Sequence, residues 1–421
     1  MFHLPKKKFW NYENKLVTIF FFSIGFVFFD RLAINYLIPF IQQDFTITNT
    51  QIGMIGSALA ITWAISGPLG GFLSDKVKNK KLVLALFILA FSVVSLMHGL
   101  VASFGVLLLL RLVMGVLEGP ITPITQSILA VESSEKRRGF NMGFTMNTGN
   151  AVFGSLLAPL IIVALANAFD WHTAFYLTII PGIILAFFIL KSVRNPKINI
   201  ADLGPSTTSM EKVGIKDVMG HRNIVLSIII FSFFMIYMMA FQIFGPTFLV
   251  NYKQLPTSSM SLVMAAFGAG FAIFGMLVPA ISDRIGRRPT GIIFGFLSIF
   301  TPLTLLFVDS FGLLLLFVFI CSSGSGAAAL YMSIIPAETV PVRYAGVAIG
   351  ITIGIAEVFG GVISPIVSGL AADAFGLTAP LLISCCAAFL AFVFSLFIKE
   401  TAPAKISVEQ DIRPDQVVTD L

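Results

Sequence analysis

The sequence predicts an all-α membrane protein whose twelve transmembrane helices form two pseudo-symmetric six-helix bundles. The first observation is composition: 57% of the 421 residues are hydrophobic and only 11% are charged, against about 25% charged residues in ordinary soluble domains. The mean hydropathy of +0.94 agrees with this. The second observation is that the apolar residues gather in twelve segments. The third is that the two halves of the chain share short motifs at nearly one offset.

Each apolar segment is long enough to cross a bilayer, since about 20 apolar residues suffice for one helix. One long polar stretch divides the segments into six and six. We therefore expect an N-terminal region (1–15), a first bundle (16–191), a linker (192–222), a second bundle (223–398) and a tail (399–421). The segments lie roughly at 16–40, 51–74, 81–102, 104–130, 139–166, 172–191, 223–250, 258–282, 290–308, 311–335, 345–371 and 376–398.

The loops between these segments alternate in charge. Lysine and arginine cluster after the second, fourth, eighth and tenth segments, whereas aspartates predominate in the opposite loops. Basic loops face the cytoplasm in membrane proteins. We therefore expect both termini in the cytoplasm and a multi-pass protein of the plasma membrane. The net charge of +6 reflects this topology, and we expect no binding of nucleic acid.

The two halves of the chain repeat. Residues 74–76 (Ser-Asp-Lys) recur as residues 282–284 (Ser-Asp-Arg), 208 residues later. Residues 152–154 (Val-Phe-Gly) recur as residues 358–360, 206 residues later. Duplication of a six-helix unit in the same orientation predicts two related bundles with a cavity between them near the midplane of the membrane.

Four charged residues lie inside the first and fourth apolar segments. Asp30 and Arg31 stand near the middle of the first segment, and Arg111 and Glu118 stand in the fourth. A charge at the bilayer centre costs roughly 2.5–3.5 kcal/mol on insertion scales, so such groups usually serve a function. Neighbours in sequence do not face each other on a helix, so each of the first pair needs its own partner. The alternative is a structural pair that holds the first helix to a neighbour.

Arg111 and Glu118 are seven residues apart, which is two helical turns, so they share a face about 10 Å apart along the axis. Gly115 lies between these two residues, and Gly119 directly follows Glu118. The two glycines form a small-xxx-small face that lets another helix approach closely. We expect this segment to place both charges and a close helix contact at the centre of the first bundle.

Two related motifs follow the second and eighth segments. Residues 71–81 read Gly-Phe-Leu-Ser-Asp-Lys-Val-Lys-Asn-Lys-Lys, and residues 279–288 read Pro-Ala-Ile-Ser-Asp-Arg-Ile-Gly-Arg-Arg. They resemble the loop signatures of the major facilitator superfamily, although Lys78 and Pro279 replace glycines of that pattern. The resemblance implies a cytoplasmic latch, and topology-setting charge is the alternative. The implied gating residues are Asp75, Lys76, Asp283, Arg284, Arg287 and Arg288.

Within that superfamily the chain resembles the anion:cation symporters, which carry organic anions such as sugar acids, usually with protons. The resemblance rests on residues 29–31 (Phe-Asp-Arg) and on Arg111 and Glu118, which match the branch's Arg-x6-Glu. Residues 170–175 (Asp-Trp-His-Thr-Ala-Phe) are similar to the branch's Trp-Arg-x-x-Phe, with His172 in place of the arginine.

The chemistry of these groups suggests their roles. A carboxylate in low-dielectric surroundings has a raised proton affinity, so Asp30 and Glu118 are the predicted proton carriers. Glu357 is a third acid within a segment, and it either titrates, binds a cation or accepts a hydrogen bond from a substrate hydroxyl. An arginine offers a planar fork to a carboxylate, so Arg31 or Arg111 is expected to bind an anionic substrate.

Further polar and aromatic residues are candidates for the wall of the cavity. Trp63 is expected to stack on substrate, and Asn147 and Asn150 share a face at a spacing of three residues. For each residue alone, a hydrogen bond between helices or simple packing is an equally good interpretation. The remaining candidates are Asn35, Tyr237, Gln242 and Tyr331.

The sequence therefore favours a proton-coupled symporter that imports a small organic anion by alternating access. A proton-coupled exporter of drugs or metabolites is the alternative, and a membrane-embedded sensor is a third hypothesis. No ATP-binding motif and no nucleophile, metal or cofactor constellation is present, so we expect no enzyme and no cofactor. The expected partners are an anionic small molecule, protons and the lipid bilayer, and we expect a monomer.

Overall fold

The computed structural model describes residues 11–77, 79–195, 215–403 and 405. All regular elements of these residues are helices, and twelve helices are long and apolar enough to cross a membrane. The predicted fold class is thus confirmed. The ends of the predicted segments lie within four residues of the ends of these helices.

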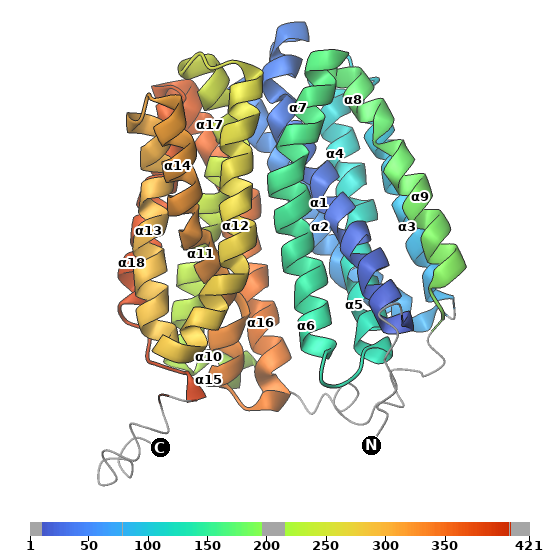
Figure 1. Cartoon of the computed structure of the whole chain (residues 1–421), viewed down its shortest axis with the longest axis vertical. Coiled ribbons are helices and arrows are strands. Elements are labelled where there is room, and N and C mark those ends of the chain that lie inside the picture. Colours follow the sequence, from blue (N-terminus) through green and yellow to red (C-terminus); the bar gives the residue numbers. More distant parts are fainter. Residues whose placement is uncertain (1–10, 78, 196–214, 404, 406–421) are drawn as a thin grey trace, which may run out of the picture. The chain divides into compact units, whose positions relative to one another are not determined.

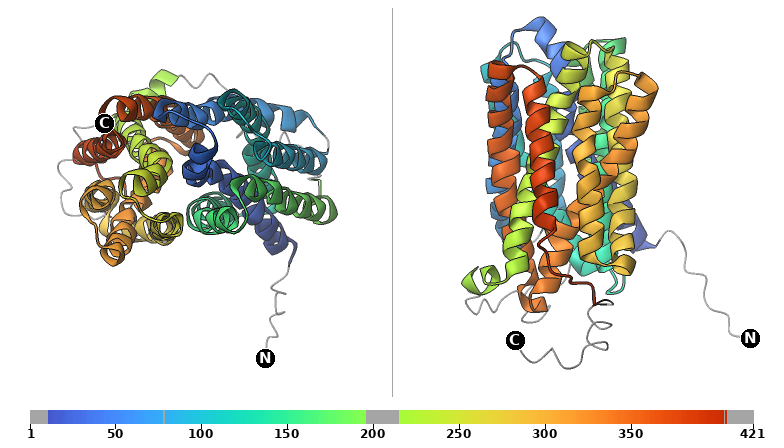
Figure 2. Two further views of the ribbon diagram at one scale, coloured as in Figure 1. Left: turned by 90° about the horizontal axis from the view of Figure 1, so that it is seen from above. Right: turned by 90° about the vertical axis from the view of Figure 1, so that its left-hand side faces the viewer.

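The described residues form two compact units (Figures 1 and 2). The first unit contains the residues up to Phe45 and those from Ala58 to the end of the sixth span. The second contains Thr46–Ser57 and the residues after the sixth span. One helix, α2 (Asn49–Lys76), therefore contributes its first turns to the second unit and the rest to the first.

Six spans make up the first unit, and α1 is the most enclosed of them. In α1, 72% of the most apolar stretch is buried, against 33% in the sixth span. It contacts η2, α7, η1 and α9, while α3 lies against α9 and α4. Besides α2, the elements are α1 (Tyr12–Asp44), α3 (Lys80–His98), α4 (Phe104–Glu118), α5 (Ile121–Glu132), α6 (Arg138–Gly143), η1 (Phe144–Thr148), η2 (Asn150–Leu157), α7 (Ala158–Ala168), α8 (Trp171–Leu177) and α9 (Ile179–Ser192).

The second unit repeats this plan, with α11 enclosed in the place of α1. It lies against α18, α16 and η7, and α13 lies against α18 and η5. A short helix, α10, falls within the predicted linker, of which residues 196–214 lie outside the description. The elements are α10 (Ile215–Met219), α11 (Arg222–Thr247), η4 (Phe248–Tyr252), α12 (Thr257–Ile285), α13 (Arg287–Phe307), α14 (Phe311–Cys321), η5 (Ser322–Ala327), η6 (Leu330–Ile334), α15 (Ile335–Thr339), α16 (Val342–Glu357), η7 (Val358–Ile363), α17 (Ser364–Phe375) and α18 (Thr378–Ser395).

The internal repeat extends to irregular features of the helices. A proline stands inside both α1 and α11, at Pro39 and at Pro246, 207 residues later. Wide π-helical turns precede both α7 and α17, which begin at Ala158 and at Ser364, 206 residues apart. Such turns are rare and often mark functional sites. The duplication inferred from short motifs therefore holds at the level of backbone geometry.

The start of α2 is held within the second unit by Asp373 of α17. Its carboxylate accepts hydrogen bonds from the backbone N–H groups of Asn49 and Thr50, both at 2.9 Å. A carboxylate at a helix N-terminus satisfies unpaired N–H groups and complements the helix dipole. Ser57 adds a bond from its hydroxyl to the carbonyl of Val362, at 2.6 Å.

The predicted small-residue face of α4 is confirmed within the first unit. A Cβ added to Gly115 would overlap the hydroxyl of Thr62 and the carbonyl of Leu59, both on α2. The hydroxyl of Ser66 donates to the carbonyl of Gly115 at 2.9 Å. The absence of a side chain at Gly115 is what lets α2 and α4 touch, as in other close membrane helix pairs.

This contact predicts opposite effects for two glycine substitutions in the same helix. Gly115→Ala should lower the free energy of unfolding by about 1–3 kcal/mol, because the new methyl group overpacks the contact with α2. Gly105→Ala is the matched control, since nothing lies within 4 Å of a Cβ there and alanine favours helix. Thermal unfolding in detergent measures both, and equal midpoints would contradict the assigned contact.

Candidate functional site

Asp30 lies at the centre of the first unit and is fully buried. The hydroxyl of Ser95 on α3 donates a hydrogen bond to its Oδ1 atom. Ser95 in turn lies 2.8 Å from the hydroxyl of Thr178, which joins α8 to α9. A chain of two hydroxyl groups therefore runs from the carboxylate across α3 to the sixth span.

Arg31 has a different partner from that of Asp30, as expected for adjacent residues of a helix. Its guanidinium group lies over the ring of Trp63 on α2, 5.1 Å from the ring centroid. A cation over an aromatic face is worth about 0.5–1 kcal/mol when exposed and about 2 or more when desolvated. The structure thus assigns Trp63 a contact with Arg31, whereas stacking of Trp63 on a substrate stays a prediction.

Arg111 and Glu118 are buried on one face of α4, as their spacing predicts. Arg111 donates from Nη1 to the carbonyl of Arg31 at 3.3 Å. The charges of Asp30 and Glu118 act on Arg111, and the charges of Asp30, Arg31 and Arg111 act on Glu118. The four residues, which we call the buried charge cluster, therefore form one electrostatic unit.

Much of the hydrogen-bonding capacity of this cluster is unused. Among the described residues, no partner reaches Nε or Nη2 of Arg111, either carboxylate oxygen of Glu118, or Oδ2 of Asp30. Most buried polar groups in proteins are hydrogen-bonded, and exceptions call for an explanation. Donors of a guanidinium group and acceptors of two carboxylates side by side are suited to hold an anion and protons.

Three polar residues beside the cluster were not anticipated from the sequence. Ser95 and Thr178 form the hydroxyl chain, and His98 lies one turn after Ser95 on α3. His98 is fully buried, its Nδ1 atom lies 2.8 Å from the carbonyl of Val94, and its ring contacts Phe175. The signal was present, because polar residues recur every three positions from Ser92 in an otherwise apolar segment.

The asparagines of the first unit are placed differently from one another. Asn35 is buried on α1, Asn147 is exposed and Asn150 is half-buried. The expectation that Asn147 and Asn150 share a face assumed an α-helix, whereas the two residues lie in the π-helical turns of η1 and η2. Hydrogen bonds from i to i+5 make each turn wider, so the α-helical spacing argument does not apply there, and a shared face stays a prediction.

The predicted cavity and proton-binding residues of the second unit, Tyr237, Gln242, Tyr331 and Glu357, are all buried. The hydroxyl of Tyr237 on α11 lies near those of Thr301 and Ser325. The hydroxyl of Tyr331 reaches the backbone of Gly291, where a Cβ would overlap it. Gln242 lies on α11, and Glu357 ends α16 where the π-helical turns of η7 begin. A cavity shared by these residues and the buried charge cluster stays a prediction.

The second loop motif forms a network centred on Arg287. Its Nη2 and Nε atoms bond to the two carboxylate oxygens of Glu338 at 2.8 and 3.2 Å. Its Nη1 atom lies 2.6 Å from Asp283. Such two-pronged pairing of arginine with carboxylate is directional as well as strong. Asp283, Arg287 and Glu338 therefore form an ion cluster at the end of the second unit where α12 ends and α13 begins.

Glu400 extends this network and was not singled out in the sequence. Its carboxylate accepts from the backbone N–H groups of Arg287 at 2.7 Å and Arg288 at 3.1 Å, at the start of α13. Arg284 is exposed. In the first unit neutral residues take the corresponding place, since Asn79 and Asn195 bond to each other and to the start of α3. The side chains of residues 73–76, and with them predicted gate residues Asp75 and Lys76, lie outside the description.

Removal of the central arginine of this network should destabilise the second unit. Arg287→Ala leaves Glu338 without its cation, and a charged hydrogen bond of this kind is worth about 1.5–3 kcal/mol. We expect a lower unfolding midpoint in detergent. Arg284→Ala removes an equal charge from an exposed position and should change stability by less than about 0.5 kcal/mol. Equal effects of the two substitutions would contradict the network.

Residues 170–175 serve to join the sixth span to the first. Asp170 accepts from the backbone N–H of Thr173 and caps α8. The indole Nε1 of Trp171 donates to Asp44 at the end of α1, and the Trp171 ring stacks on His172. The observed contacts are therefore structural, and His172 lies beside the tryptophan at the end of the span.

Comparisons with known proteins agree with this architecture. A sequence profile described as "Major Facilitator Superfamily" matches residues 20–354 and 226–415. The hexuronate transporter of Bacillus subtilis (strain 168) is 32% identical over 260 residues, 60% of each chain. The quinolone resistance protein NorA of Staphylococcus aureus is 27% identical over 184 residues, 44% of this chain and 46% of the relative. The match therefore spans 60% of the length of the hexuronate transporter and 46% of the length of NorA.

Among solved structures, a bacterial homolog of the human lysosomal transporter Spinster has the same fold. Its TM-score is 0.75 at 18% sequence identity, and the match covers 92% of this chain and 97% of the other. Twelve helices that can span a membrane and the family match define a multi-pass membrane protein of the transporter class. The chain belongs to the Major Facilitator Superfamily, and the predicted resemblance to its anion transporters is confirmed by the similarity to the hexuronate transporter.

Proposed function

We propose that this protein imports a small organic anion together with protons, by alternating access. The observation that carries the proposal is the buried charge cluster with its unused donors on Arg111 and unused acceptors on Glu118 and Asp30. A substrate carboxylate satisfies the guanidinium donors in the paired geometry that arginine favours. The similarity to a hexuronate transporter supports a sugar acid or another carboxylate as the substrate.

In this proposal the two acids carry the protons. A carboxylate deep in the protein keeps its charge only while a cation or hydrogen-bond donor faces it. Glu118 lies among three charged neighbours and shares Arg111 with Asp30. An anion that binds to Arg111 weakens the electrostatic attraction between Arg111 and the two acids. It thereby favours protonation of Asp30 and Glu118. Substrate binding and proton binding are coupled through one guanidinium group.

The remaining features complete the proposal. We place both termini in the cytoplasm and the protein in the plasma membrane, because basic residues crowd the loops on that side. The ion cluster of Asp283, Arg287 and Glu338 holds the cytoplasmic end of the second unit in one state of the cycle. The transporter has no enzymatic activity, needs no cofactor and acts as a monomer.

The acids are tested by neutral substitutions of equal size. Asp30→Asn and Glu118→Gln should abolish accumulation driven by a proton gradient and spare exchange of substrate across the membrane, because exchange needs no net proton transfer. Asp170→Asn is the matched control, since this acid caps α8 outside the spans. The measurement is uptake of labelled substrate into liposomes. Full accumulation by both variants would refute the proposed proton carriers.

The substrate class is tested with liposomes that contain a pH-sensitive dye. Sugar acids, aromatic acids and cationic drugs are added in turn. We expect inward acidification with one class of anion, and its loss in Arg111→Gln. The similarity to quinolone resistance protein NorA makes export the second candidate. Proton movement only with cationic compounds, and in the outward direction, would establish export and reject anion symport.

A further inference from the structure

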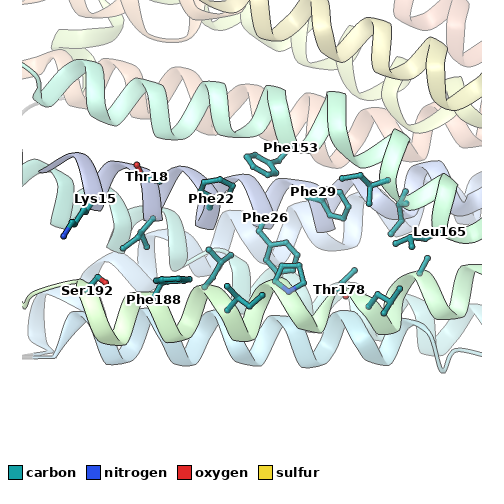
Figure 3. Close-up of a pocket in the computed structure, with 18 residues that line it drawn as sticks. Lys15, Thr18, Phe22, Phe26, Phe29, Phe153, Leu165, Thr178, Phe188 and Ser192 are labelled. Carbon is teal, nitrogen blue, oxygen red and sulfur yellow. The ribbon is translucent and has the colours of Figure 1, made fainter. Parts of the chain in front are cut away.

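A long apolar groove lies in the first unit, apart from the buried charge cluster. It encloses about 720 Å³ between α1, η2, α7, α8 and α9 (Figure 3). Cavities that bind ligands in proteins measure about 300–1,000 Å³. Fourteen of its eighteen lining residues are apolar, and the four polar ones are Lys15, Thr18, Thr178 and Ser192. Such a lining excludes a hydrophilic anion as the occupant.

The polar residues are arranged at the ends of the groove. Lys15, Thr18 and Ser192 lie at one end, the phenylalanines follow along its length, and Thr178 lies towards the other end (Figure 3). Lys15 and Phe29 are fourteen positions apart on α1, which corresponds to about 21 Å. The hydrocarbon of one leaflet is about 15 Å deep. The lining also includes Ala174, three positions from the start of the sixth span (Trp171–Ser192), and Leu165 lies at the far end (Figure 3). The groove therefore begins at the membrane surface at Lys15 and continues well beyond the bilayer centre.

The surface end of the groove is positively charged. Lys15 is exposed there, and the exposed Arg194 follows the end of α9. Arg194 is fixed close to the start of α1, with its guanidinium 4.4 Å from the ring centroid of Tyr12. Glu13, two positions before Lys15 on α1, accepts hydrogen bonds from Ser134 and Asn141, which are not part of the lining. A polar head with negative charge complements this end, and an apolar chain complements the rest.

We propose that this groove binds one acyl chain of an anionic phospholipid, with the phosphate of its headgroup at Lys15. The charged end and the apolar lining agree on an amphiphile with a negatively charged head. The side of the groove is partly open, since Phe22, Ile184 and Phe188 are each nearly half exposed, so the lipid enters laterally. Its chain ends beside Thr178, the outer hydroxyl group of the chain that leads through Ser95 to Asp30.

The experiment measures lipid retained by the full-length protein in native mass spectrometry, with phosphatidylglycerol and phosphatidylcholine of the same chain length. Ile184→Trp fills the groove, whereas Ile183→Trp on the same helix does not, because Ile183 is outside the lining although equally exposed. We expect one retained phosphatidylglycerol in the wild type and in Ile183→Trp, and about tenfold weaker retention in Ile184→Trp. If Ile184→Trp does not fold, Ile184→Phe takes its place.

The headgroup is tested separately. Lys15→Gln should reduce the preference for phosphatidylglycerol over phosphatidylcholine about fivefold, which corresponds to about 1 kcal/mol for one lysine near an anionic headgroup. Lys136→Gln makes the same change in an exposed turn away from the groove and should leave the preference unchanged. Equal retention by Ile183→Trp and Ile184→Trp would overturn the lipid site. Equal retention of both lipids by the wild type would overturn its anionic character.

Discussion

The structure depends on how charges are kept inside an apolar bundle. Removal of a charge from water is costly, and the cost is met only where partners replace the lost hydration. In the first unit this need ties four spans together: Asp30 requires Ser95 on α3, Arg31 requires Trp63 on α2, and Arg111 reaches back from α4 to the carbonyl of Arg31. These bonds fix α1 among its neighbours more specifically than apolar contacts do.

The close approach of α2 and α4 also helps to provide partners for the buried charges. Gly115 lies between Arg111 and Glu118, one turn from each, so the helix face that carries the charges is also the face that touches α2. The contact with α2 brings Trp63 to Arg31. A larger residue at Gly115 would move α2 and α4 apart. This would disturb the contacts of Arg31 and Arg111 with their partners.

Duplication explains where the charges lie and where they do not. With the offset of 207 residues given by Pro39 and Pro246, Tyr237 stands in the second unit where Asp30 stands in the first. With the same offset between α4 and α14, Ser325 stands in the place of Glu118. Tyr237 and Ser325 lie near each other, so the corresponding position is polar in both units but charged only in the first. The carboxylates of this position therefore belong to one repeat only.

The sequence by itself determined the spans, the duplication and the identity of the central charged residues, because the cost of polar groups in a membrane leaves a strong pattern in composition. It also determined that Arg111 and Glu118 share a face, since that follows from helical spacing. Only the tertiary structure decided the partners. Contacts such as Asp30 with Ser95, Arg31 with Trp63 and Glu400 with the start of α13 join residues far apart in sequence, and they depend on which faces of different helices meet. The π-helical turns around Asn150 escaped prediction because they depend on local hydrogen bonding that composition does not encode.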